Sequence, residues 1–163
     1  MTLSKSYIDI TEALAILADT VGSESWILLT DQEKQASLVQ STFLLDSSFN
    51  WVGTISTHEQ ELRWPRSNVY DRDDRLVPSD IIPNQIKQAT ALMALHLSQA
   101  GGINSVSNNV KSIKVGPISI GLDSEESIDP QIIPRFIISI LSSFGVYEGP
   151  SSSDSAYNVR AYR

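Results

Sequence analysis

The residues best suited to chemistry stand together in one stretch, Arg63-Trp64-Pro65-Arg66, and the charge cluster 71–75 follows closely. A proline pushes the preceding residue toward extended backbone, here Trp64. Arginines contribute planar donors that are always charged. Aromatic rings beside cationic side chains suit a single-stranded-DNA site, and here Trp51, Trp64 and Tyr70 lie near Arg63, Arg66, Arg72 and Arg75. Trp64 can instead hold an ordered loop against the domain. We expect Arg63, Trp64, Pro65 and Arg66 to form such a structural loop, with the DNA-binding interpretation left open.

Catalytic and metal-binding patterns do not emerge from the rest of the chain. It has no cysteine and only two histidines, His58 and His96, so thiolate nucleophiles and zinc–thiolate sites are excluded. Neither a nucleophile elbow nor a phosphate-binding loop is present. A calcium loop beginning at Asp71 fails, because Leu76 and Ile82 stand where it needs glycine and glutamate. The sequence therefore predicts no enzyme, no catalytic residue, no metal site and no cofactor.

Charge limits the partners that the surface can attract. Nineteen acidic residues against twelve basic ones give a net charge of -7. Tight binding to phosphates needs several lysine or arginine contacts, so an acidic surface argues against it, though not against a local basic patch. The apolar stretches are far shorter than the ~20 residues of a membrane span, and we expect no membrane partner.

Four helices are expected to position these residues. Capping boxes open the first helix at Asp9 and the second at Thr30. Pro83 suits the first turn of a third helix, and residues 129–144 form a fourth. Residues at helical spacing should face the core: Ile10, Leu14, Leu17 and Val21; Leu38, Val39, Phe43, Leu45 and Phe49; Ile86, Ala89, Met93 and Leu97; Ile133, Phe136, Ile137, Ile140 and Leu141.

A β-hairpin interrupts the helices at about 109–122, where apolar and polar residues alternate around Gly116-Pro117. A lone hairpin is marginally stable in water, so it should contact a neighbour. The expected contact residues are Lys111, Lys114, Gly116 and Pro117. The expected fold class is therefore mainly α, a small helical bundle with an inserted β-hairpin and an extended C-terminal arm. Residues 1–148 would form the domain, and 149–163 the linker and arm.

The end of the chain changes composition twice. Residues 149–155 are a polar, serine-rich stretch typical of a flexible linker. The last eight residues mix strand-forming side chains with arginines, as a docking arm would, although a frayed tail has a similar composition. The candidate docking residues are Tyr157, Val159, Arg160, Tyr162 and Arg163.

Several motifs occur in an order that resembles a known family. They are Leu44-Leu45-Asp46 followed by Trp51, Leu62-x-Trp64-Pro65-Arg66, Ile82-Pro83 at a helix start, and Val110 to Pro117. Together they cover roughly residues 7–145 and resemble the head-to-tail connector proteins of tailed bacteriophages, also called adaptor or head-completion proteins. Some relatives of these proteins are described as DnaT-like single-stranded-DNA-binding proteins.

The resemblance implies a structural role in the virion neck, for a protein made in the host cytoplasm. Such adaptors form a ring on the portal, a dodecamer by resemblance, and extend the DNA channel toward the tail. The implied partners are the portal protein, a tail-side neck protein and further copies of the chain, and packaged DNA passes through without tight binding. The C-terminal arm would dock into the portal. The alternative function is a single-stranded-DNA-binding accessory protein.

Overall fold

The computed structural model describes residues 5–99, 113–115, 118–120 and 133–148. Its helices are α1 (Ile10–Leu17), α2 (Glu24–Ile27), α3 (Asp31–Ser48), α4 (Asn84–Gln99) and α6 (Arg135–Leu141). Its strands are β1 (Phe49–Trp51), β2 (Thr54–Ile55), β3 (Arg66–Ser67), β4 (Ile113–Val115), β5 (Ile118–Ile120) and β6 (Gly145–Tyr147). Within these ranges no helix is long and apolar enough to span a membrane.

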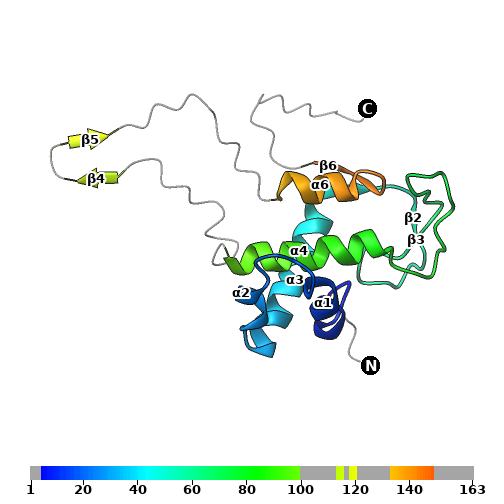
Figure 1. Ribbon diagram of the computed structural model, residues 1–163. Helices are drawn as coiled ribbons and strands as arrows, with labels where there is room; N and C mark the ends of the chain where they lie inside the picture. The colour runs from blue at the N-terminus through cyan, green and yellow to red at the C-terminus, as the bar shows by residue number, and fades with distance from the viewer. Residues whose placement is uncertain (1–4, 100–112, 116–117, 121–132, 149–163) are drawn as a thin grey trace.

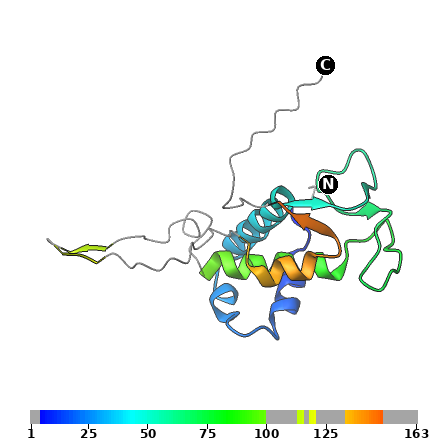
Figure 2. The same ribbon diagram turned by 90° about the horizontal axis from the view of Figure 1, so that it is seen from above.

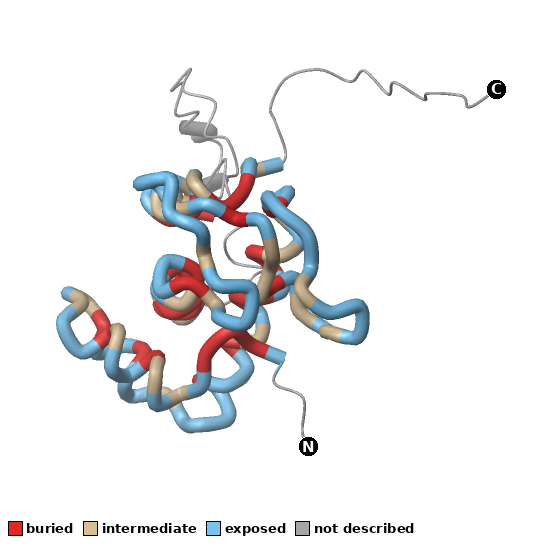
Figure 3. Tube along the Cα trace, turned by 90° about the vertical axis from the view of Figure 1, so that its right-hand side faces the viewer, coloured by how far each residue is buried: buried red, intermediate tan, exposed pale blue. Residues whose placement is uncertain are grey.

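Helix α4 is the central element. It runs through the middle of the domain, with α6 on one side, α1 and α2 on the other, and α3 crossing it (Figure 1). Ile86, Met93 and Leu97 belong to one apolar cluster, which includes residues of α6 and β1. Ala91 and Leu95 belong to a second cluster, with residues of α1 and α2. Buried segments accordingly gather inside the domain (Figure 3), and α4 joins the two clusters.

Local sequence signals set the helix starts. The Glu12 amide donates to the side chain of Asp9 over 2.8 Å, and the Glu12 carboxylate accepts from the Asp9 amide. Thr30 and Glu33 form the same reciprocal pair at the start of α3. Both predicted capping boxes are therefore confirmed. The first helix is shorter than expected, because it ends at Leu17 and the chain then turns into α2.

A short antiparallel ribbon joins segments far apart in the sequence. Strand β1 pairs with β6, with Phe49 opposite Tyr147 and Trp51 opposite Gly145, and the two strands lie side by side in Figure 2. The Phe49 and Trp51 rings stack at 5.1 Å between centroids. Both rings belong to the first apolar cluster, so the ribbon is part of the core.

The expectation of a mainly α bundle is wrong, and the protein is a small α/β domain. The described residues form three two-stranded antiparallel sheets, β1–β6, β2–β3 and β4–β5. Only β4–β5 lies in the expected hairpin, where Ile113 pairs with Ile120. The strands of the other two sheets have two or three residues, too short for alternation to reveal them. The expected C-terminal arm, 149–163, lies outside the described residues.

Four residues expected in the core lie on the surface instead. Val21 is 98% exposed because it follows the end of α1, Leu14 is exposed on α1, and Phe43 is exposed on α3. Phe136 is 52% exposed on α6. On that helix Ile137 and Leu141 take the buried positions. The apolar face predicted for residues 129–144 is therefore wider than the face that α6 buries.

Candidate nucleic-acid interface

Trp64 is a core residue and offers no free ring face. Its side chain is 1% exposed. Trp51 and Phe144 meet it in edge-to-face geometry, with centroids 5.8 and 5.7 Å away. The peptide bond between Trp64 and Pro65 is cis. With its ring enclosed in this way, Trp64 cannot stack on a base from solvent. Trp51 is buried as well, whereas Tyr70 is 55% exposed.

The guanidinium of Arg66 is committed to the backbone around it. It donates to the carbonyl oxygens of Val52 at 2.6 Å and Gly53 at 2.7 Å, and to that of Arg63 at 3.2 Å. Partial burial lowers the pKa of Arg66, and the nearby charge of Arg63 acts in the same direction. Arg66 thus ties the turn after β1 to the loop and is poorly placed to bind a phosphate.

Asp46 lies beneath the same loop and organises it. Its carboxylate accepts hydrogen bonds from the Tyr7 hydroxyl, from Trp51 Nε1 at 3.1 Å and from the Arg63 amide at 3.4 Å. Burial raises the pKa of Asp46, while these hydrogen bonds act in the opposite direction. Among the described residues no cluster of acidic, histidine or cysteine side chains could hold a metal ion. The contacts of Asp46 tie Tyr7 and Trp51 to the backbone of the loop at Arg63.

The two arginines of the turn at 71–75, Arg72 and Arg75, make different contacts. Asp71 accepts hydrogen bonds from the amides of Asp73 and Arg75, at 2.8 and 3.0 Å. The Arg75 guanidinium forms ion pairs with Asp71 at 3.0 Å and Asp73 at 2.6 Å. The bond from the Arg75 backbone is the main cause of the lowered pKa of Asp71. Arg72 instead reaches α6, where Nη2 lies 3.4 Å from the Ser142 hydroxyl.

Arg72 lines a groove of about 420 Å³ between this turn, α4 and α6. The lining residues are Arg72, Asp73, Gln85, Gln88, Ser139, Ile140, Ser143 and Phe144. One cation, one carboxylate that is paired with Arg75, and several neutral amide and hydroxyl groups thus share one surface. Phe136 lies three and four residues before Ser139 and Ile140, hence on the same face of α6. Arg72 thus lies beside α6, and Phe136 is an exposed ring on that helix. Cationic and aromatic side chains are the groups that sites for single-stranded nucleic acid combine.

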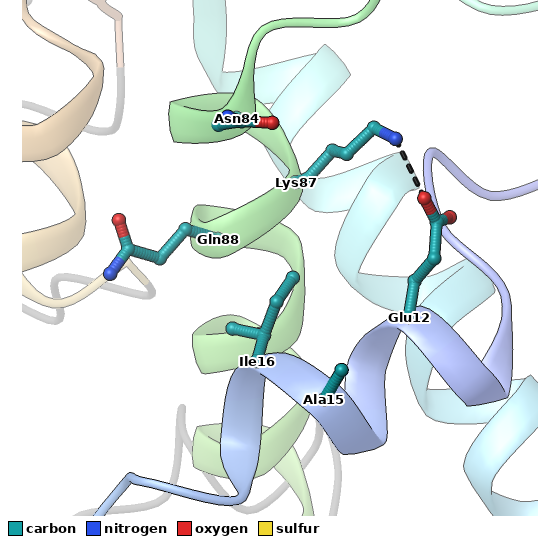
Figure 4. A pocket seen from close by; sticks show the side chains of 6 residues that line it. All are labelled: Glu12, Ala15, Ile16, Asn84, Lys87 and Gln88. Atoms are coloured by element: carbon teal, nitrogen blue, oxygen red, sulfur yellow. Dashed lines mark hydrogen bonds and ion pairs between the residues drawn. The ribbon is translucent and has the colours of Figure 1, made fainter.

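A second cavity, of about 450 Å³, lies between α1 and α4. There Lys87 Nζ approaches Glu12 Oε1 at 2.7 Å (Figure 4), so the lysine charge is compensated. Gln88 lines both cavities, and its side chain extends away from this ion pair toward α6 (Figure 4). The groove at Arg72 is therefore better suited to a phosphate than the cavity at Lys87.

The sequence missed this groove because three segments far apart in the chain build it. Phe136, which was expected in the core, is exposed, and in the cluster 71–75 the carboxylates of Asp71 and Asp73 pair with Arg75 while Arg72 contacts Ser142. Of the expected hairpin contacts, Lys114 lies in β4, opposite Ser119. Lys111, Gly116 and Pro117 lie outside the described residues, as do the candidate docking residues Tyr157, Val159, Arg160, Tyr162 and Arg163.

Comparison with known proteins gives one result. A family model described as "Putative DnaT-like ssDNA binding protein" matches residues 2–163. No curated protein and no solved structure matches the chain. The family match extends over the helices, the ribbon and the groove alike, so the chain belongs to this DnaT-like family.

Proposed function

We propose that the protein binds single-stranded DNA in the groove lined by Arg72. The family description supports binding of this kind. The proposal rests on the contacts that the Arg72 guanidinium makes. Carboxylates hold Arg75 and backbone carbonyls hold Arg66, whereas among the described residues Arg72 contacts one hydroxyl, that of Ser142, at the edge of a polar groove. Its guanidinium is thus placed to pair with a phosphate.

The groove predicts weak, mildly salt-dependent binding. Each phosphate contact with a single strand contributes a slope of roughly -0.7 to the dependence of log K on log salt concentration. Arg72 supplies one such contact, and the net charge of -7 adds no general attraction. Gln85, Gln88 and Ser139 supply hydrogen-bonding groups beside it. Most of the recognition would then come from neutral groups and not from charge.

Fluorescence anisotropy with a labelled single-stranded 20-mer tests the proposal at low salt. Arg72→Gln should weaken binding and make the salt slope shallower by roughly 0.7. Lys5→Gln is the matched control, because it removes the same charge from an exposed residue that does not line the groove. Absence of binding by the wild-type protein contradicts the function. Equal effects of the two substitutions contradict the site.

A second candidate function is a subunit of a phage neck ring. Large apolar side chains are exposed at Val21, Leu28, Phe43 and Val146. Single exposed apolar residues are common on proteins, but several of this size also suit contacts between subunits. The resemblance to head-to-tail connectors supports the same function. The partners would be the portal protein, a tail-side neck protein and copies of the chain, with DNA passing through the ring.

Electron microscopy of the full chain mixed with purified portal rings tests this candidate. A regular ring of the protein on the portal is the expected result. Portal rings that stay bare at high protein concentration would contradict it. The DNA-binding measurement is made on the protein alone, so the two candidates fail independently.

A further inference from the structure

We propose that Phe136 stacks on an unpaired base of a strand that Arg72 binds through a phosphate two to three nucleotides away, so that the groove distinguishes single strands from duplex DNA. This inference rests on the proposed DNA-binding function and adds the part of the nucleotide that is recognised. It assigns a role to a ring that the fold does not bury, since Phe136 is 52% exposed.

The spacing along α6 fits a short run of nucleotides. Arg72 contacts Ser142 near the end of the helix, and Phe136 lies near its start. Six residues at about 1.5 Å each separate the two positions by roughly 9 Å along the axis. That length equals two to three nucleotides at the stacked rise of about 3.4 Å. A phosphate at one end and a base at the other can therefore belong to the same short segment.

The chemistry between these ends suits a base edge. Ser139 and Ser143 line the groove from α6, and Gln85 and Gln88 line it from α4. Their side chains offer donors and acceptors without a net charge. Every base has a face that an aromatic ring can stack on, so little sequence preference is expected. In a duplex the base faces are already stacked within the helix, so Phe136 should add nothing to duplex binding.

The test compares Phe136→Leu, which removes the ring and keeps an apolar side chain, with Phe136→Tyr, which keeps the ring. Stacking of a base on an aromatic side chain contributes to the binding free energy, so Phe136→Leu should lower affinity for the single-stranded 20-mer about 5-fold or more. The tyrosine variant should stay close to wild type. Affinity for the duplex of the same sequence, and for a 20-mer without bases, should be equal in all three proteins. Phe136 is exposed, so melting midpoints should match and serve as a folding control.

The outcomes separate this inference from the function beneath it. If the wild-type protein binds the oligonucleotide and both variants bind equally well, stacking on Phe136 is wrong and DNA binding stands. If the wild-type protein does not bind, the proposed function itself fails. If Phe136→Leu changes the sedimentation coefficient and leaves DNA affinity unchanged, the ring belongs to a contact between copies of the chain, which also overturns the inference.

Discussion

At the scale of single residues, Trp64 illustrates the difference between a residue that could bind and one that holds the fold. Its ring fills the space between Trp51 and Phe144. We predict that Trp64→Ala lowers the free energy of unfolding by about 3–5 kcal/mol, as for other buried aromatic residues. Urea denaturation followed by circular dichroism measures this loss. An unchanged midpoint would show that the ring is not buried.

Trp64→Phe is the matched control for that substitution. The indole Nε1 of Trp64 is buried and has no hydrogen-bond acceptor among the described residues. A phenylalanine therefore keeps the aromatic contacts and loses no hydrogen bond. It should destabilise the protein clearly less than alanine does. Equal losses for the two variants would show that aromatic packing is not the source of the stability.

The raised pKa of Asp46 predicts that the stability of the folded protein depends on pH. Burial raises its pKa in the folded state above the ordinary aspartate value, so the folded protein holds this proton more tightly than the unfolded chain. The resulting contribution is complete below the unfolded pKa and is lost as the pH rises through the folded pKa. Asp46→Asn should flatten the fall in stability over that window. Denaturation midpoints measured at several pH values test this, and an identical profile in the variant contradicts it.

At the scale of elements, Arg66 connects the turn after β1 to the loop before β3. Its planar guanidinium donates to several carbonyl oxygens at once, which a lysine ammonium cannot reproduce. We predict that Arg66→Lys lowers the free energy of unfolding by about 1.5–3 kcal/mol, the value of a hydrogen bond to a charged group. Chemical denaturation measures the loss, and anisotropy should show unchanged affinity for single-stranded DNA. If Arg66→Lys is as stable as the wild-type protein but binds single-stranded DNA more weakly, this loop is part of the DNA interface.

The elements that the sequence predicts well are those whose signals are local. The capping pairs at Asp9 and Thr30 lie within four residues, and both form as expected. The ribbon joining Phe49 to Tyr147 depends on residues distant in the chain, and no local period reveals it. The same reason explains the candidate site. Arg72 comes to line one groove with Ser139 and Ile140 of α6 only after α4 and α6 are packed together.

At the scale of the whole molecule, acidity and exposed apolar surface point to different partners. A net charge of -7 keeps duplex DNA from adhering generally. That property suits a channel wall, and it equally suits a protein that selects single strands by stacking. The exposed side chains of Val21 and Leu28, on either side of α2, favour contact with another protein surface. Measuring DNA binding and self-association on the same variants separates these roles.

The double substitution Val21→Ser with Leu28→Ser tests the neck-ring candidate. These side chains are 98% and 85% exposed, so their replacement should change monomer stability by less than about 0.5 kcal/mol each. If they lie between subunits, the variant should self-associate more weakly and occupy fewer positions on portal rings. Analytical ultracentrifugation over a concentration series and electron microscopy with portal measure the two effects. Ile81→Ser, at an exposed apolar residue in a different segment, is the control. Equal assembly by all three proteins would place the subunit contact away from α2, and only a loss confined to the double variant supports it.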